Sequence, residues 1–353
     1  MIRRARIGII GGGRIGQMHA RNLSARTDVE KVVLLGRDAS RTAKAAAALR
    51  ADLQADGGHR GAIAQRTGEV TEIEVRTFAT EACTDLDGLI VATPTATRLQ
   101  VVEAAAGAGV PLLVEKPLAL SLRDQHHLLC LLEEAHVRCM VGFQRRFDPG
   151  YRALREAVRS GRLGPLRAII AINGDYLDAD EAFVPTSGGM WRDQAIHDFD
   201  ILPWLTGEEA VSVWATSGVL NNPMYERYGD VDTGTAVVTF ASGLQATVLC
   251  GRNLGSGQET RTEIHGTNGA VGTGLGRHST VRSVDEAPAA GAGVAAKDSA
   301  ARFADAFANE IEAFLDLVDG RGHNESPAKE SPNSLRLALA VEESCRTGQP
   351  VDL

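Results

Sequence analysis

The sequence predicts an α/β protein of two domains: an N-terminal parallel sheet with helices on both faces, then an α+β domain with an open, mostly antiparallel sheet. Three observations support this prediction. A chain of 353 residues is long for one domain. Apolar runs alternate with helical patterns over residues 1–143, whereas strand-like runs separated by turns dominate residues 144–353. We place the domains at these ranges, with the alternative that the helix expected at 333–347 packs back on the first domain.

Short apolar runs define the expected strands. In the first domain they lie within residues 5–10, 29–38, 85–95, 111–115 and 138–143. Their continuous apolar character is typical of a sheet covered on both faces. Residues 51–73 resemble an insertion between the second and third of these strands. In the second domain the runs lie within 165–176, 210–219, 234–252 and 261–273, with a hairpin turn at Ser242–Gly243 and a small-residue loop at 288–298.

Composition and charge exclude several classes of function. The formal net charge of −8 argues against a nucleic-acid partner, which favours a basic surface. No apolar run approaches the length of a membrane helix, and glycines interrupt the one at the N-terminus, so we expect a buried strand there rather than a signal peptide. The five cysteines form no CxxC pair, so we expect no disulfide framework, no zinc site and a cytoplasmic location.

Three glycines predict a dinucleotide site. Gly11, Gly13 and Gly16 form GxGxxG directly after the first apolar run and at the start of a helical pattern. The first glycine allows a tight turn, the second lets the backbone approach a pyrophosphate, and the third lets the helix pack on the strand. The pyrophosphate would lie at the helix N-terminus, where unpaired N–H groups favour anions. The first domain is therefore predicted to be a Rossmann domain.

The end of the second strand bears on the choice of cofactor. NAD sites usually carry an acid here for the ribose 2′-hydroxyl, but this chain has Gly36 followed by Arg37. A glycine leaves room for a 2′-phosphate, and an arginine can pair with it, so NADP(H) is favoured. Two alternatives stay open: Asp38 serves the ribose of NAD(H), or Arg37 is a solvated surface residue.

The stretch "RDQAIHDFD" at residues 192–200 predicts a second site. On one continuous helix, Asp193, His197 and Asp200 would share a face, and Trp204 would follow one turn later. Acid, imidazole and acid beside aromatic side chains indicate a solvated surface, a metal site or a catalytic site. No further ligand cluster accompanies them, so we expect no metal.

Five segments in order resemble the glucose–fructose oxidoreductase/inositol dehydrogenase/rhizopine-catabolism (Gfo/Idh/MocA) family. They are "GIIGGGRIGQMHARNL", "ATPTAT" at 92–97, "VEKPLAL" at 114–120, "GFQRRFDPGY" at 142–151 and "GGMWRDQAIHDFD" at 188–200. The last two most resemble the inositol 2-dehydrogenase branch. The resemblance implies reversible hydride transfer between a nicotinamide and a polyol or sugar, in a dimer or tetramer associated through the outer face of the C-terminal sheet.

The resemblance also implies roles for individual residues. Lys116, Asp193 and His197 fall on the catalytic positions. The residues implied at the substrate are Gln144, Arg145 (or Arg146), Asp175, Asp193, His197 and Asp200. Besides the glycines, Gly36, Arg37 and Lys116, we assign Arg14, Ile15, Thr93, Pro94 and Glu115 to the cofactor site. Arg145 and Arg146 have an alternative interpretation as a structural ion-pair group.

The chain departs from the family pattern at two further places, the first of which affects the prediction of the exact substrate. Inositol dehydrogenases tend to carry a tyrosine motif where this chain has Ser256, Gly257 and Gln258. Arg98 stands where a histidine is frequent.

The implied chemistry suits these side chains. Oxidising a secondary alcohol needs a base, for which the imidazole of His197 is suited, and Asp193 can orient that imidazole. The ammonium of Lys116 can stabilise the developing alkoxide, so the reaction needs no metal. The alternatives are an NADPH-dependent reductase of another keto-sugar or aldehyde, and a non-catalytic NADP(H)-binding regulator.

Overall fold

The computed structural model describes residues 4–55, 71–281 and 296–353. The chain divides into two compact units, the first of residues 1–142 and 307–330 and the second of residues 143–306 and 331–353. No helix in the described ranges is long and apolar enough to cross a bilayer.

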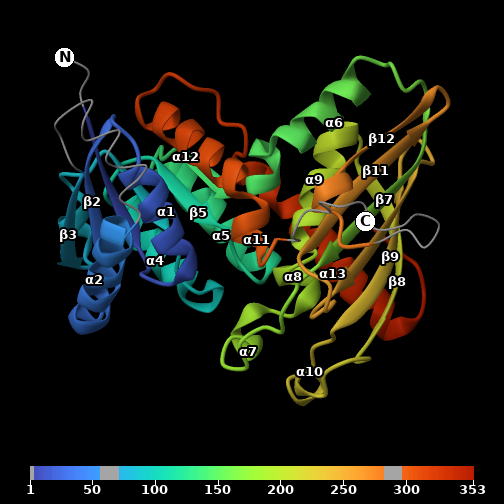
Figure 1. The fold of residues 1–353 in the computed structure, drawn as a ribbon, viewed down its shortest axis with the longest axis horizontal. Coiled ribbons are helices and arrows are strands. Elements are labelled where there is room, and N and C mark those ends of the chain that lie inside the picture. The colour runs from blue at the N-terminus through green and yellow to red at the C-terminus, as the bar shows by residue number, and fades with distance from the viewer. Residues whose placement is uncertain (1–3, 56–70, 282–295) are drawn as a thin grey trace. The chain divides into compact units, whose positions relative to one another are not determined.

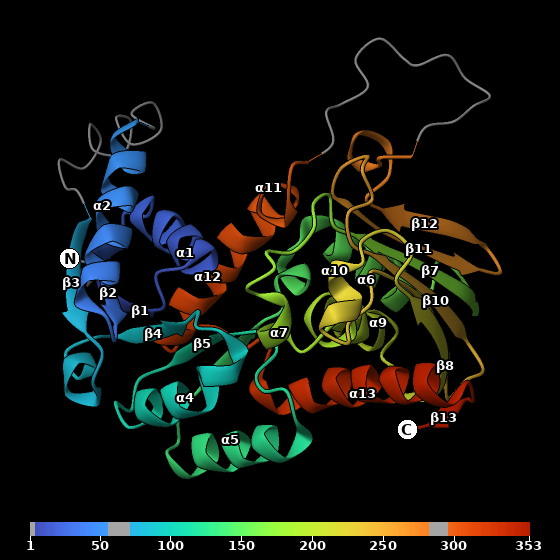
Figure 2. The same cartoon turned by 90° about the horizontal axis from the view of Figure 1, so that it is seen from below.

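The first unit is built on a six-stranded sheet of order β3-β2-β1-β4-β5-β6 in which all neighbours pair in parallel. The chain order reverses between β1 and β4, which is where open α/β sheets bind ligands, beyond the carboxyl ends of the strands. Helices α1, α2 and α12 lie on one face and α4 and α5 on the other (Figure 2). The strands are β1 (Ala5–Ile10), β2 (Val29–Gly36), β3 (Glu72–Thr77), β4 (Gly88–Val91), β5 (Leu112–Glu115) and β6 (Cys139–Gly142), and the helices are α1 (Arg14–Ser24), α2 (Ala39–Ala55), α4 (Arg98–Ala106), α5 (Leu122–Glu134) and α12 (Ala304–Val318).

Strand β3 has no counterpart among the expected strands. It lies at the sheet edge and begins at the end of the insertion that we expected at residues 51–73. Its sequence "EIEVRT" lacks an apolar run because an edge strand buries little surface, and Glu74 instead pairs with Lys31 of β2 and with Arg76. The first residues of the same stretch complete α2. Residues 56–70 lie outside the described ranges.

The segment 307–330 differs from the expected boundaries because it joins the first unit. The rings of Phe307 and His19 of α1 meet edge to face with centroids 6.0 Å apart. Further along α12, Phe314 and Val318 fill the space above Gly88, where an added Cβ would approach them to 3.0 and 2.7 Å. The amide nitrogen of Val141 in β6 donates to the Ser326 carbonyl oxygen at 2.8 Å. These contacts bury the apolar side of α12 against the first sheet.

The second unit is built on a seven-stranded sheet of order β12-β11-β7-β10-β9-β8-β13. Its described pairs are antiparallel except β7–β10, which is parallel. The predicted hairpin is confirmed: β9 and β10 pair across Ser242–Gly243, where Gly243 adopts a φ of 87°. The strands are β7 (Leu166–Gly174), β8 (Ala210–Gly218), β9 (Thr233–Phe240), β10 (Gln245–Gly251), β11 (Glu259–Gly266), β12 (Gly269–Thr273) and β13 (Val351–Asp352), and the helices are α6 (Pro149–Arg159), α7 (Val184–Ser187), α8 (Met190–Asp193), α9 (Ile196–Thr206), α10 (Met224–Arg227), α11 (Ser299–Arg302) and α13 (Ser331–Thr347).

Helices cover one face of this sheet, with α6, α8, α9 and α13 gathered against it (Figure 1). Helix α13 packs on β8 and α9, and the Ser344 hydroxyl accepts a hydrogen bond from the Ala215 amide at 2.9 Å. The structure thus places this helix in the second unit, in contrast to the alternative that it packs back on the first domain. Most of the loop expected at 288–298 lies outside the described ranges.

The opposite face of the second sheet exposes apolar side chains. Ile170, Leu249 and Trp214 are 39 %, 39 % and 42 % exposed. They lie on β7, β10 and β8, and alternation along each strand directs their neighbours inward. Association of subunits through this face stays a prediction.

Candidate functional site

The glycine loop after β1 has the geometry that a pyrophosphate requires. Gly11 has a φ of 111°, and an added Cβ there would lie 2.6 Å from the Ala92 carbonyl oxygen. A Cβ on Gly16 would lie 1.9 Å from the Gly11 carbonyl oxygen, so the third glycine lets α1 pack against the loop. A Cβ on Gly13 would meet nothing within 4 Å, which leaves the backbone open to a ligand. The backbone at each glycine is thus compatible with the role that its position predicts, and binding of a pyrophosphate stays a prediction.

The N-terminus of α1 completes an anion site. Gly13 is the N-cap and gives no side-chain hydrogen bond to the first turn, which holds no acidic residue. Arg14 is exposed and Ile15 is partly exposed in that turn. Backbone N–H groups at an uncapped N-terminus favour a phosphate, so this loop fits the pyrophosphate of a dinucleotide.

The residues at the end of β2 bear on whether the cofactor carries a 2′-phosphate. A Cβ on Gly36 would lie 2.1 Å from the Thr42 hydroxyl oxygen, so packing against α2 also requires this glycine. Asp38 accepts a hydrogen bond from the Arg41 amide at 3.0 Å, which engages its carboxylate at the start of α2. Arg37 is exposed and forms no ion pair with any described residue.

The loops after β4 and β5 are tied together by Arg98, a residue whose role the sequence did not reveal. Its buried guanidinium donates to the carbonyl oxygen of Thr93 at 2.7 Å and to that of Pro117. Pro94 follows Thr93 in the first loop, and Lys116 precedes Pro117 in the second. Arg98 thus fixes Thr93 and Pro94 relative to Lys116, whose side chain is partly exposed.

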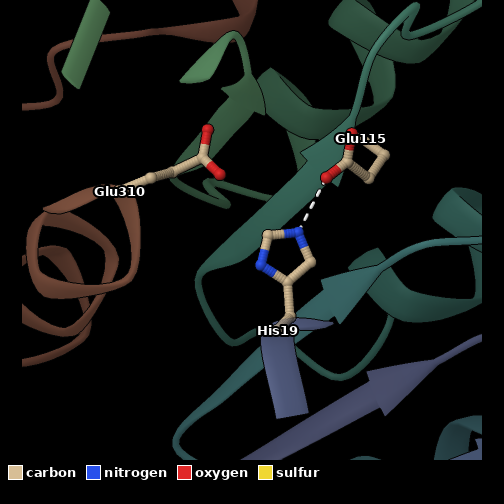
Figure 3. A group of neighbouring side chains, drawn as sticks. All are labelled: His19, Glu115 and Glu310. Carbon is tan, nitrogen blue, oxygen red and sulfur yellow. Dashed lines mark hydrogen bonds and ion pairs between the residues drawn. The ribbon is translucent and has the colours of Figure 1, made fainter. Parts of the chain in front are cut away.

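Glu115 lies in a buried polar cluster with His19 of α1 and Glu310 of α12 (Figure 3). A hydrogen bond of 2.7 Å joins His19 Nε2 to Glu115 Oε1, and both oxygens of the Glu310 carboxylate lack a hydrogen-bond partner among the described residues. Burial alone would raise the pKa of Glu115, but His19, Lys116 and Arg98 lower it below its ordinary value. Burial, and then the charge of Glu115, raise the pKa of Glu310 well above its ordinary value.

This cluster contains side chains that can ligate a metal ion, and its two carboxyl groups differ in their surroundings. Glu115 already accepts a hydrogen bond from His19, and the positive charges of Lys116 and Arg98 act on it. The raised pKa of Glu310 corresponds to a neutral carboxylic acid. Glu115, which we assigned to the cofactor site, therefore has its carboxylate in the interior of the first unit.

The stretch 190–206 is two helices and not the single helix we expected. Helix α8 ends at Asp193 and α9 begins at Ile196. Between them, the side-chain amide nitrogen of Gln194 donates to the backbone carbonyl oxygens of Asn173 and Gly251, each at 3.0 Å. In return, the side-chain amide nitrogen of Asn173 donates to the backbone carbonyl oxygen of Gln194 at 3.0 Å. The break is therefore fixed to the carboxyl ends of β7 and β10, and Asp193 and His197 lie on different helices.

Buried ion pairs hold α9 in place. Arg145 Nη1 lies 2.6 Å from Asp198 Oδ1, and the other Asp198 oxygen accepts from Asn173 at 2.6 Å. Arg146 donates to both oxygens of Asp200, at 2.9 and 2.6 Å. All four charged side chains are at most 5 % exposed. Arg145 and Asp200, which the resemblance placed at the substrate, thus belong to ion pairs that connect the segment after β6 to α9, as in the alternative interpretation. Gln144, in the same segment, is also buried.

Of the side chains predicted at the substrate, three remain partly exposed: Asp175, Asp193 and His197. Asp175 follows β7, and its Oδ1 accepts from the Gln258 amide nitrogen at 3.0 Å. Asp193 Oδ2 lies 3.6 Å from Nη2 of Arg252, the residue after β10. The His197 ring meets the Phe143 ring edge to face, with centroids 6.2 Å apart. Because β7 and β10 are parallel, their carboxyl ends bring Asp175 and Arg252 to the same edge of the sheet.

The sequence matches family models over most of its length. Residues 5–143 match the model described as "Oxidoreductase family, NAD-binding Rossmann fold", and residues 151–272 match the "GFO/IDH/MocA C-terminal domain". The chain belongs to the Gfo/Idh/MocA oxidoreductase family. The predicted fold and the predicted family are both confirmed.

Several members of this family are similar to the chain along its whole length. The inositol 2-dehydrogenase of Rhizobium meliloti is 33 % identical, with 96 % of this chain and 95 % of the relative covered. The scyllo-inositol 2-dehydrogenase (NAD(+)) of Bacillus subtilis is 30 % identical, with 100 % and 97 % covered. The structure of scyllo-inositol dehydrogenase from Lactobacillus casei, with bound NAD(H) and scyllo-inositol, superposes with a TM-score of 0.81 at 25 % identity over 99 % of both chains.

Sequence reasoning missed several polar residues of this Gfo/Idh/MocA chain that the structure brings to the site. Arg252 lies beside Asp193 and Asn173 bonds to the helix break, while Gln258, which the sequence marked only as a departure from the family pattern, donates to Asp175. One signal was present: Arg252 is the last residue of the run predicted at 234–252, and the ends of parallel strands are where functional groups gather. That signal depended on knowing that β7 and β10 are parallel.

The buried carboxyl of Glu310 predicts a pH-dependent stability. Because its folded pKa is raised, the protonated form stabilises the fold at low pH, and this contribution is lost as the pH rises above the ordinary carboxyl pKa. Replacement by neutral glutamine removes that loss. We expect Glu310→Gln to gain about 3 °C in melting temperature relative to the wild type between pH 5 and pH 8. Melting curves over that range measure the difference. Exposed Glu133→Gln is the control, and an equal shift for Glu310→Gln at every pH would contradict a neutral Glu310.

Proposed function

We propose that the chain is a dehydrogenase that transfers a hydride between a nicotinamide dinucleotide and a secondary alcohol of a polyol or sugar, of the inositol type. One observation carries the proposal. Asp198 and Asp200 of α9 are buried in ion pairs. Asp175, after β7, and Asp193, at the end of α8, remain partly exposed, as does His197. The names of the relatives, which are inositol dehydrogenases, support the substrate class.

In the proposed reaction the bound nicotinamide accepts the hydride, and the side chains move the proton. His197 accepts the hydroxyl proton as general base, since an imidazole titrates near neutral pH. Asp193 orients the ring and stabilises the imidazolium. Lys116 stabilises the negative charge that develops on the substrate oxygen. In the reverse direction His197 returns the proton.

Asp175 is the proposed contact for a substrate hydroxyl. Its Oδ1 is held by Gln258, which is itself buried, so the carboxylate is oriented before substrate binds. Gln258 also supports a second candidate function, reduction of another keto-sugar or an aldehyde with NADPH. It lies within the segment where inositol dehydrogenases tend to carry tyrosines, and it presents an amide that is already engaged by Asp175.

NADP(H) is the proposed cofactor, in preference to NAD(H). Arg37 is exposed at the end of β2 and forms no ion pair with any described residue, so its guanidinium can pair with a 2′-phosphate. The Asp38 carboxylate accepts from the Arg41 amide, which leaves it less suited to a ribose hydroxyl.

Initial rates with a panel of inositols and aldoses test the reaction. We expect at least one polyol to reduce NADP⁺, and His197→Ala to lower kcat by about 10²- to 10⁴-fold, the usual contribution of a general base. NADPH binding, followed by fluorescence, should stay unchanged. His126→Ala, which changes an exposed imidazole on α5, is the control. If NADPH binds but no polyol reacts, the keto-sugar reductase or the non-catalytic regulator takes the place of this proposal.

The cofactor preference is tested at Arg37. Loss of one ion pair to a phosphate predicts that Arg37→Ala raises KM for NADP⁺ roughly 10-fold, which corresponds to about 1.4 kcal/mol, with KM for NAD⁺ unchanged. Arg41→Ala is the control: it removes a neighbouring exposed guanidinium but keeps the backbone N–H that donates to Asp38. It should change neither KM for NADP⁺ nor KM for NAD⁺. Equal effects of Arg37→Ala on both cofactors, or a wild type that prefers NAD⁺, would exclude the proposed role.

A further inference from the structure

Arg252 follows β10 directly and is among the most deeply buried charges of the second unit. Its side chain is 2 % exposed, and Nη2 lies 3.6 Å from a carboxylate oxygen of both Asp193 and Asp230. Burial would lower its pKa, but the charges of Asp193, Asp230 and Asp175 offset this and hold the pKa above its ordinary value. The guanidinium is therefore a permanent positive charge among three carboxylates.

Arg252 and the residue that follows it make several contacts with their surroundings. The Arg252 amide donates to the Asp232 carbonyl oxygen at 2.8 Å, and the guanidinium lies over the Tyr225 ring, 5.4 Å from its centroid. The next residue, Asn253, adopts a left-handed φ of 55° and donates to Asp178 at 2.9 Å. Because these contacts hold Arg252, its side chain can in turn hold neighbouring side chains in position.

Asp230 and Arg252 contact the two ends of α8. The Met190 amide at the start of the helix donates to Asp230 Oδ1 at 2.8 Å, and Asp193 at its end faces Arg252. Gly189 lets the start of α8 lie close to Asp230, because a Cβ there would lie 3.2 Å from Asp230 Oδ1. Four-residue α8 has little stability of its own, so these contacts contribute to where Asp193 lies.

The three charges differ in exposure in an informative way. The side chains of Arg252 and Asp230 are 2 % and 6 % exposed, whereas that of Asp193 is 18 % exposed. The inner pair is thus part of the protein interior, and Asp193 is the member that reaches outward. At 3.6 Å the contact from Arg252 to Asp193 is an ion pair rather than a hydrogen bond.

We propose that Arg252 is a positioning residue for the dehydrogenase reaction: it holds Asp193 in place, so that Asp193 can orient the His197 imidazole. This inference rests on the proposed function, in which Asp193 and His197 form the acid–base pair. Arg252 itself touches neither substrate nor cofactor in this proposal.

Three variants of the full chain test the proposal by kinetics. Arg252→Met removes the charge at similar length, Arg252→Lys keeps it, and Arg302→Met removes a comparably buried arginine that pairs with Asp148 elsewhere in the unit. We expect Arg252→Met to lower kcat about 100-fold, the cost of a misplaced catalytic group, with KM for substrate and NADP⁺ changed less than about 3-fold. Arg252→Lys should recover at least about 10-fold of that loss. If Arg252→Met loses no more kcat than Arg302→Met, or if lysine recovers nothing, the proposal is wrong.

A second measurement does not depend on turnover. In protein labelled with ¹⁵N-histidine, the His197 ring signals are assigned by their loss in His197→Ala. We expect Arg252→Met to change the His197 ring ¹⁵N shifts, which report its tautomer, and Arg302→Met to leave them unchanged. A wild type without activity on any polyol would refute the proposed function alone. Unchanged His197 shifts in Arg252→Met would refute the positioning role, whether or not the enzyme turns over.

Discussion

The parallel pairing of β7 with β10, inside a sheet whose other described pairs are antiparallel, is the constraint on which the second unit depends. It brings two carboxyl strand ends side by side. Gln194 spans both ends by donating to the carbonyl oxygens of Asn173 and Gly251, and this interrupts the helix between Asp193 and Ile196. A buried amide with both donors satisfied is costly to displace, so the helix break has a single position.

The carboxylates of the second unit differ in their partners and in their exposure to solvent. Buried charges need partners, and the second unit supplies them: Asp198 has Arg145, and Asp200 has Arg146. Asp232 instead accepts three backbone N–H groups, from residues 220 to 222, and despite its burial these lower its pKa below the ordinary value. Asp175 and Asp193, by contrast, keep contact with solvent, and they lie beside Gln258 and Arg252. In the proposed function these two are the acids that act in the reaction.

The sequence was most informative where a local pattern has a local cause. The GxGxxG loop, the apolar parallel strands and the Ser242–Gly243 hairpin follow from backbone sterics and from the periodicity of burial, and the structure contains all three. Strand β3 escaped prediction because charge pairs, rather than an apolar run, hold this edge strand.

Long-range partners explain what the sequence could not reveal at the site. The spacing of Asp193, His197 and Asp200 suits one helix, and only the distant acceptors on β7 and β10 break it. For the same reason, the pairing of Arg145 with Asp198 and of Arg146 with Asp200 could not be deduced from residues more than 50 positions apart. Family resemblance located these positions but could not say which of them face inward.

The turnover number of Gln194→Leu, measured beside its affinity for NADPH, tests most directly whether the helix break organises the reaction. Leucine has a similar size but cannot donate to Asn173 and Gly251, so the account predicts that kcat falls at least about 10-fold and that the variant is less stable by about 1–3 kcal/mol. NADPH affinity should match the wild type, because the glycine loop belongs to the first unit. A Gln194→Leu variant with lowered stability and wild-type kcat would show that the break serves the fold alone.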